Sequence, residues 1–320
     1  YAVGSILSNP EKDIVIKYCE NDLDATEAFF YKSLKQLTLR KQYGIIERAN
    51  FLNSSEGNLA REIFSKALGK EMQMSSWDVK KLRTYRTKVN INEIIFDYIK
   101  FNDPINQETL DKFNSKVWIY NDNPDVASES ISFQVPYKNV IREYAEGGLH
   151  SACKSGIYQS DDDYILYDVD FASYYPHLTF RNKLHPAHIP EEIFNKIYEG
   201  FYKDRQGYSK KDVRNYVLKI LLNISYGLSK DKYSFLYDPR WQLTICINGQ
   251  LILTLLTEKI LEYIPDAFII FENTDGAMFR VKRDKVHLLE KACKEIGDLV
   301  NIPLETQECQ KIILRDVNNY

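Results

Sequence analysis

The chain has 320 residues, enough for about two domains with a sizeable core. Hydrophobic residues make up 44% of it and charged residues 27%, which is typical of an ordinary globular protein and excludes a chain built from low-complexity segments. The net charge of −3 lacks the excess of Lys and Arg that generic nucleic-acid binders carry. The 42 Lys and Arg residues can nevertheless gather on one face and form a local basic groove.

The cysteines and the terminal sequence indicate the kind of compartment. The five cysteines show neither C-x-x-C pairing nor an accompanying His cluster, so we expect buried or inert thiols in a reducing compartment and no structural zinc: Cys19, Cys153, Cys246, Cys293 and Cys309. No apolar run approaches the roughly 18 residues of a membrane span, so no transmembrane helix is predicted. The N-terminal Tyr1–Gly4 has no initiator Met and no signal-peptide pattern, so we expect an internal piece of a longer protein.

The N-terminal half is predicted to be helical first and mixed afterwards. Residues 9–75 combine charged and apolar residues at helical spacing, with a capping start at Asn21–Asp24. Residues 76–165 are mixed, with strand-like alternation at Lys116–Tyr120 and a break at Gly147-Gly148.

The C-terminal half begins with a strand, and helices follow it. The solvated turn Asp161–Asp163 leads into an apolar strand that closes at Asp170. Glu191–Arg205 and Asp212–Tyr226 are predicted as two helices joined by a turn at Gln206–Lys211. A long helix at Trp241–Tyr263, a hairpin around Asp275 and a helix near Lys285–Val300 complete the order. This order predicts an α+β fold, because strands and helices do not alternate.

Asp170 and Asp275 are the candidate metal ligands because each lies where an apolar strand ends. Two strand-end carboxylates can hold two divalent ions about 3.5–4 Å apart, and the strands that carry them could lie side by side in one sheet. The carbonyl of the residue after Asp170 could face the same ion, which suits Mg²⁺. Two structural alternatives stay open: Asp170 caps the following helix while Tyr175 packs in the core, and Asn273–Gly276 is a plain β-turn.

The helix at residues 212–226 carries a polar stripe. Lys219, Asn223 and Tyr226 lie at i, i+4 and i+7, with Asn215 one turn earlier, while Leu218, Leu221 and Leu222 face the core. A Lys near two metal ions would stabilise charge that develops on phosphate oxygens. Arg205, with Lys210 or Lys211 at the turn, could bind the terminal phosphates of a nucleotide; the alternative is a solvated charged face.

Taken in order, these three segments resemble motifs A, B and C of family B DNA polymerases. Motif A, D-x-x-S-L-Y-P, is similar to Asp170–Pro176; motif B, K-x-x-x-N-S-x-Y-G, to Lys219–Gly227; and motif C, Y-x-D-T-D-S, to Phe271–Gly276. The resemblance covers nearly the whole chain, and three motifs in the right order are far more specific than any one alone.

Flanking segments agree with this resemblance. Tyr18 and Asp22 resemble the Y-x-x-x-D motif of the family's 3′–5′ exonuclease domain, and Tyr144 with Gly147-Gly148 resembles its Y-x-G-G segment with one extra residue. The runs Gly147–His150, Phe235–Pro239 and Arg315–Tyr320 look like phage members of the family, especially those of crAss-like phages.

The resemblance implies a role for each matching residue. Asp170, Asp275 and the Phe171 carbonyl would bind two Mg²⁺ or Mn²⁺ ions; Tyr175 would be the steric gate against a ribose 2′-OH; and Lys219, Asn223 and Arg205 would bind the incoming deoxynucleoside triphosphate, with Lys219 also catalytic. Primer–template DNA would contact Tyr144, Gly147, Gly148, Tyr226, Gly227 and Tyr320, and Tyr18 with Asp22 would be an exonuclease remnant. Other replication proteins would be partners, and the location would be the cytoplasm, that of the host if the protein is viral.

The implied domains follow the motifs along the chain. They are the C-terminal part of a ribonuclease H-like exonuclease domain at 1–75, a linker and the start of the palm at 76–165, palm with motif A at 166–190, two-helix fingers with motif B at 191–230, and palm with motif C at 231–320, with the thumb missing.

The sequence departs from the family pattern in places. Asn273 replaces the first Asp of motif C, Gly276 and Ile224 replace Ser, and Asn318–Tyr320 stands in place of a K-x-Y motif. These departures keep open a catalytically weakened polymerase-like module that binds DNA or a replication partner. Two further alternatives are a nuclease, for which residues 1–75 offer no D-x-E motif, and a structural α+β protein.

Overall fold

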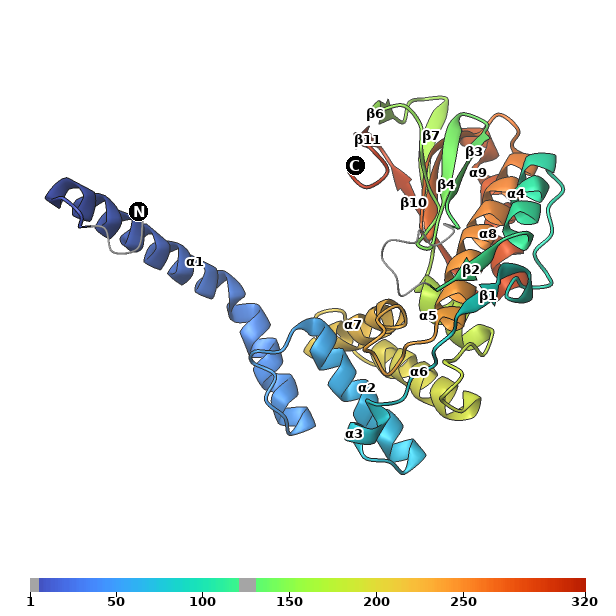
Figure 1. Cartoon of the computed structure of the whole chain (residues 1–320). Helices are drawn as coiled ribbons and strands as arrows, with labels where there is room; N and C mark the ends of the chain where they lie inside the picture. The colour runs from blue at the N-terminus through green and yellow to red at the C-terminus, as the bar shows by residue number, and fades with distance from the viewer. Residues whose placement is uncertain (1–5, 121–130) are drawn as a thin grey trace.

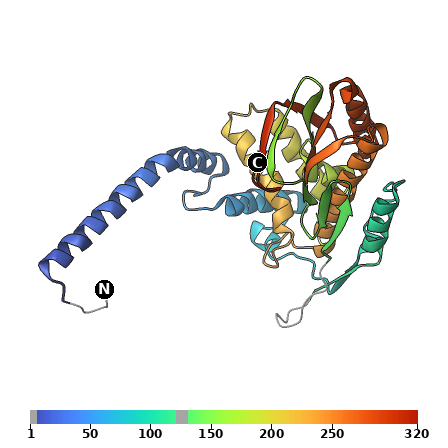
Figure 2. The ribbon, with the colours of Figure 1, turned by 90° about the horizontal axis from the view of Figure 1, so that it is seen from above.

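The computed structural model describes residues 6–120 and 131–320, so Tyr1–Gly4 lies outside the described residues. A long N-terminal helix projects from a body in which helices cover a sheet (Figures 1 and 2). The helices are α1 (Asn9–Glu47), α2 (Glu56–Met72), α3 (Ser76–Val79), α4 (Pro104–Asn114), α5 (Tyr174–Arg181), α6 (Glu191–Gln206), α7 (Val213–Leu228), α8 (Pro239–Tyr263) and α9 (Val286–Val300). The strands are β1 (Lys88–Asn90), β2 (Val117–Ile119), β3 (Phe133–Tyr137), β4 (Val140–Tyr144), β5 (His150–Ala152), β6 (Gly156–Gln159), β7 (Tyr164–Phe171), β8 (Phe268–Asn273), β9 (Gly276–Lys282), β10 (Leu304–Cys309) and β11 (Lys311–Leu314).

The N-terminal segment is helical from residue 9, as predicted, but the capping start predicted at Asn21–Asp24 is wrong. Helix α1 begins at Asn9, and at its N-terminus the Ser8 amide and hydroxyl both donate to the Glu11 carboxylate, as in a capping box. Asn21–Asp24 therefore lies inside the helix, because the capping box upstream already satisfies the helix start. Among the described residues of α1, only Leu39 and Tyr43 are buried, and the N-terminal part of the helix extends away from the body (Figure 1).

The central sheet has the strand order β10-β7-β9-β8-β5-β4-β3, and every pair is antiparallel. This confirms the α+β class and the predicted hairpin around Asp275, which is β8–β9. It also confirms that the strand ending near Asp170 lies beside that hairpin, since β7 pairs with β9 along its length. Two smaller sheets, β1–β2 and β6–β11, complete the described strands.

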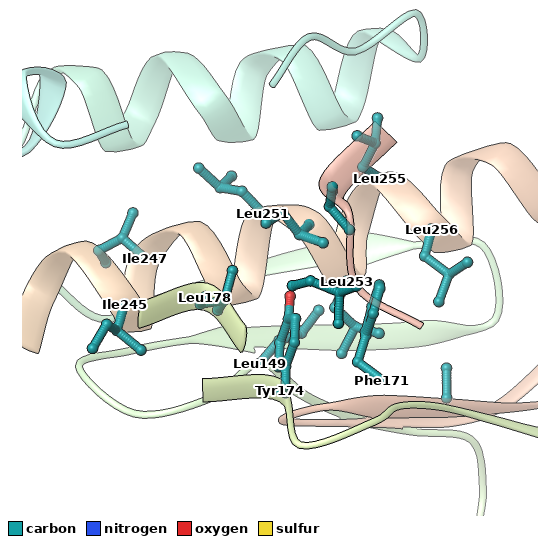
Figure 3. Close-up of a cluster of buried hydrophobic side chains, with 14 of the residues drawn as sticks. Leu149, Phe171, Tyr174, Leu178, Ile245, Ile247, Leu251, Leu253, Leu255 and Leu256 are labelled. Atoms are coloured by element: carbon teal, nitrogen blue, oxygen red, sulfur yellow. The ribbon is translucent and has the colours of Figure 1, made fainter. Parts of the chain in front are cut away.

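Helices α8 and α9 cover one face of this sheet (Figure 1). Along β7, the side chains of Tyr167, Val169 and Phe171 are buried, as the period of two in a strand requires for a face packed on the core. Figure 3 shows Phe171 and Tyr174 side by side beneath α8, and their rings stack with centroids 4.6 Å apart. The opposite face of the sheet therefore carries the polar side chains of β7.

Helix α8 is buried on nearly all sides because neighbours surround it. Its residues Pro239–Tyr263 are long and apolar enough to cross a membrane by length and composition, which the sequence analysis did not anticipate. In the structure, 94% of that apolar window is buried inside the protein, as expected of the core helix of a globular fold. Three of the five free cysteines are also buried, whereas Cys19 on α1 is exposed.

Helices α6 and α7 form the predicted antiparallel pair. Asp212 caps α7 by accepting a hydrogen bond from the Arg214 amide. Asn215, predicted to lie on the polar stripe, is instead buried, and its amide donates to the carbonyls of Arg205 and Tyr208 at 3.0 and 2.9 Å. It closes the turn between the two helices, so its role is structural.

Candidate active site

A row of residues crosses the face of the sheet opposite α8 and α9, at the end of β7. Opposed residues of antiparallel strands share a face, and the pairing register sets the members of this row side by side: Glu305 on β10, Asp170 on β7, Gly276 on β9, Asn273 on β8 and His150 on β5. Asp275 occupies the turn between β8 and β9. The prediction that Asp170 and Asp275 meet in one sheet is confirmed.

The two carboxylate residues are locked together through their backbones. The Phe171 amide donates to the Asp275 carbonyl at 2.8 Å, and the Asp275 amide donates to the Asn273 carbonyl at 2.6 Å. Gly276 leaves the space that the Asp170 carboxylate occupies, since a Cβ at this position would lie 1.7 Å from Asp170 Oδ1. The departure from Ser at position 276 therefore has a local structural reason.

Negative charge is concentrated on this face. Both carboxylates reach solvent, yet the crowding of protein around them desolvates them and raises the pKa of Asp170 and Asp275; Glu305 raises that of Asp170 further, and Asp170 that of Asp275. Burial and the neighbouring Asp170 also raise the pKa of Asp168 to about 6. Within the described part of the chain, no cationic side chain lowers the pKa of Asp170 or Asp275.

Asp168 and Glu305 were missed by the sequence analysis. Asp168 precedes Asp170 by two residues, so the period of two in a strand already puts it on the same face. Glu305 carries no such local signal, because its position depends on β10 pairing with β7 across the fold.

The oxygen atoms at this site are of the type that Mg²⁺ prefers as ligands. Within residues 6–120 and 131–320, no group of three or more His, Cys, Asp or Glu side chains is arranged to hold a metal ion. Mg²⁺, however, usually binds through one or two carboxylates and completes its shell with water and substrate phosphates. Asp170 and Asp275 are two adjacent carboxylates with unneutralised charge, and the Phe171 carbonyl follows directly on Asp170.

Tyr175, the predicted sugar gate at the start of α5, packs against α7 and α8, since a Cβ at Gly249 of α8 would lie 3.5 Å from its ring. The Tyr175 ring lies 4.5 Å from the ring of Tyr226 on α7, so motifs A and B meet here. The Arg205 guanidinium on α6 approaches Ser173 Oγ at 3.4 Å, which places a half-buried cation beside the motif A turn. Gln242 on α8, which the sequence analysis did not single out, donates to the Tyr226 hydroxyl at 3.3 Å.

The rest of the motif B stripe faces solvent. Lys219 and Asn223 on α7 are exposed, and the structure shows no contact between either side chain and the two carboxylates within the described residues. Gly227 is also exposed, with nothing within 4 Å of where a Cβ would lie. The stripe is therefore free to meet a ligand, but Tyr226 is its only member, among the described contacts, that touches motif A.

The loop before β5 supports the motif C turn. Gly148 packs so closely beneath this turn that a Cβ would lie 2.5 Å from Thr274 Oγ1, and the Thr274 amide donates to the Leu149 carbonyl at 2.9 Å. Tyr144 is 1% exposed, and its hydroxyl lies 2.9 Å from Thr254 Oγ1. This burial removes Tyr144 from the predicted DNA contacts, because its side chain is packed in the core; Gly147 remains at the edge of the loop.

The last predicted residues lie at opposite ends of the molecule. The Tyr320 ring stacks on Phe271 with centroids 4.5 Å apart, which brings the C-terminal segment onto motif C. Tyr18 and Asp22 are exposed on the projecting part of α1, and both views show that part well away from the sheet. The structure therefore does not bring them together with the other site residues.

Comparisons with known proteins give a likeness to solved structures but none in sequence. No family model matches the chain, and neither does any curated protein. The chain is similar to the solved structure of the family B DNA polymerase from the hyperthermophilic archaeon Pyrobaculum calidifontis, with a TM-score of 0.46 and 13% sequence identity. The match covers 97% of this chain and 37% of that polymerase, so the chain spans little more than a third of its length. At this identity and TM-score the likeness says nothing about activity.

Proposed function

We propose that the chain catalyses template-directed transfer of deoxynucleotides to a primer 3′-OH. The observation that carries the proposal is the convergence of Asp170 and Asp275 at one end of β7 and β9, where no cationic side chain among the described residues lowers their pKa values. The order of the three polymerase-like motifs supports the same reaction class.

The carboxylates would act as ligands of divalent cations. Asp170 and Asp275, with the Phe171 carbonyl, would hold Mg²⁺ or Mn²⁺, which when bound lowers the pKa of the attacking hydroxyl and neutralises the triphosphate. Arg205, half-buried beside Ser173, would bind phosphate oxygens and orient the nucleotide. Lys219 would add a second positive charge from α7, which has to move towards the sheet when substrate binds.

Selection of the sugar would depend on the two packed tyrosines. The Tyr175 ring, fixed between Tyr174 and Tyr226, would occupy the space that a ribose 2′-OH requires. A gate of this kind discriminates by steric exclusion, and its strength depends on how rigidly the ring is held.

The finer assignments belong to the same proposal. Residues 166–190 and 231–320 would form the palm, 191–230 the fingers and 1–75 part of an exonuclease domain, with Asn223, Gly147, Gly148, Gly227 and Tyr320 contacting nucleotide or DNA. The protein would act in phage replication in the host cytoplasm, together with other replication proteins.

The proposal is tested by primer extension with Asp275→Asn. The expected result is loss of extension with nearly unchanged affinity for primer–template DNA, because the change removes a charge but little volume. Asp284→Asn, the same change at an exposed position beyond β9, is the matched control and should extend normally. Near-normal extension by Asp275→Asn would exclude the assignment.

The second candidate is a DNA-binding module with weakened or absent catalysis. Asn273 favours it, since its amide donates to the Val317 carbonyl at 3.2 Å and so serves the C-terminal segment instead of a metal ion. Binding of primer–template DNA without metal-dependent extension by the wild-type chain would select this candidate.

A further inference from the structure

Glu272, the residue before Asn273 in motif C, has a completely hydrogen-bonded carboxylate in the protein interior. Arg142 on β4 donates two hydrogen bonds to it, Nε to Oε2 at 2.8 Å and Nη2 to Oε1 at 2.6 Å. Ser151 on β5 donates to Oε2 and Thr257 on α8 to Oε1, each at 2.7 Å. Both members of the ion pair have fully buried side chains. These four donors fill the acceptor capacity of one carboxylate.

The ion pair extends into a wider polar network on the helix side of the sheet. Arg142 Nη1 donates to Asn106 Oδ1 on α4 at 2.8 Å, and the Asn106 amide donates to Glu258 on α8 at 2.7 Å. The guanidinium also lies over the Tyr137 ring, 3.9 Å from its centroid. Glu272 is thereby tied to β4, β5 and α8 directly, and to α4 through one neighbour.

The strand that carries Glu272 pairs irregularly with its two neighbours. The β8–β9 pairing shifts register between Ile269 and Phe271, and β5 pairs with β8 over only the three residues His150–Ala152. A slip by one residue turns every side chain of a strand to the opposite face. Such a slip would move Glu272 out of the interior, leave Arg142 buried without its partner and displace the turn that carries Asp275.

We infer that Arg142 and Glu272 form a register lock that positions Asp275 against Asp170. Replacing a buried ion pair by apolar residues is often neutral for stability, whereas fixing a register is the best-attested use of buried polar groups. The inference rests on the proposed function, because the role of the lock is to place a catalytic carboxylate. Arg142 and Glu272 touch no reacting atom and are positioning residues.

The test is the double variant Arg142→Met/Glu272→Met, which keeps side-chain volume and removes both charges. We expect an unchanged or higher midpoint of thermal unfolding and a loss in kcat of about 100-fold, the cost of displacing a reacting group by about 1 Å. KM for the nucleotide should not change, because Arg205 and Lys219 are untouched. Lys259→Met/Glu262→Met, which removes an exposed ion pair from α8, is the control and should keep wild-type kinetics.

A second readout does not need activity. Cysteines placed at His150 and Asn273 face each other across β5 and β8, where opposed Cα atoms lie about 4.5–5.5 Å apart, within the separation that a disulfide spans. Oxidative crosslinking, read by peptide mass, should be efficient with the lock present and fall when Arg142→Met/Glu272→Met is added.

The outcomes separate this inference from the proposed function. A wild-type chain that fails to extend primers contradicts the proposed function, and the crosslinking still decides whether the pair fixes the register. Wild-type kcat and undiminished crosslinking in the double methionine variant would overturn the inference alone. If that variant does not fold, Arg142→Lys provides the test, because it keeps the positive charge but loses the bidentate hydrogen bond. A lower kcat at constant KM supports the lock, and an unchanged kcat refutes it.

Discussion

Gly276→Ala is a small change that should displace the Asp170 carboxylate without altering the residue itself. The added methyl group would lie 1.7 Å from Asp170 Oδ1 and 2.7 Å from the Val169 carbonyl oxygen. Real Cβ contacts essentially never fall below 3.0 Å. The Asp170 carboxylate therefore has to move by at least 1.3 Å, the difference between 3.0 Å and 1.7 Å. A misplacement of about 1 Å can cost about 100-fold in rate, and we expect a loss of at least that size.

The effect on stability should be small by comparison. The Asp170 carboxylate is the end of a side chain that can rotate away, and only the Val169 carbonyl, which is backbone, has to yield by a few tenths of an ångström. Overpacking in a well-packed region costs about 1–3 kcal/mol, and this position should lie at the lower end of that range. Kinetics should therefore change far more than folding does.

Single-turnover primer extension, with thermal unfolding measured in parallel, checks this expectation. Gly200→Ala is the matched control, because nothing lies within 4 Å of its Cβ and it lies inside α6. It should extend primers normally and gain about 0.5–1 kcal/mol from the better helix former. Wild-type extension by Gly276→Ala would mean that catalysis does not need Asp170 in its present position, and the reasoning would fail.

Three further predictions concern the charge and shape of the same face. Mg²⁺ should raise the midpoint of thermal unfolding of the wild-type chain, because a cation neutralises Asp170 and Asp275; EDTA should reverse the shift, and Asp275→Asn should show a much smaller one. Asp168→Asn should stabilise the fold at neutral pH, because burial and Asp170 raise the Asp168 pKa to about 6. A raised carboxyl pKa means that stability falls as the pH rises through that value, so the gain should vanish below the ordinary pKa of 3.8, as denaturant unfolding across pH will show. Tyr175→Ala should admit ribonucleotides while deoxynucleotide incorporation persists, measured as the ratio of kcat/KM for the two sugars; unchanged discrimination would remove Tyr175 from the gate.

Local patterns predicted the elements that carry the site. The strand before Asp170, the hairpin around Asp275 and the helix pair that follows Pro190 all have strong signals, namely apolar runs, turn formers and helical periodicity. Such signals depend on residues close in sequence, and they were sufficient to place the two carboxylates at strand ends.

What the sequence could not supply was the pairing of distant segments. Glu305 joins the acidic face because β10 pairs with β7, more than a hundred residues earlier in the chain. Asn215 lies at the correct spacing for the polar stripe, but it is buried because its side-chain amide donates hydrogen bonds to two carbonyls of the preceding turn. Tyr144 matched a binding motif in sequence, yet two aromatic neighbours and a hydroxyl partner hold it in the core.

The two departures in motif C can be explained by the same crowding of charge. The face already holds Asp168, Asp170, Asp275 and Glu305, and an Asp at position 273 would add another carboxylate where burial and repulsion already raise the pKa of its neighbours. Asn273 adds no charge, and its amide donates to the Val317 carbonyl, which an ionised Asp could not do because it only accepts. Gly276 leaves Asp170 the room it occupies. Both substitutions therefore help to keep the Asp170 and Asp275 carboxylates in place on an acidic surface. A site with these two residues as its carboxylate ligands requires this arrangement.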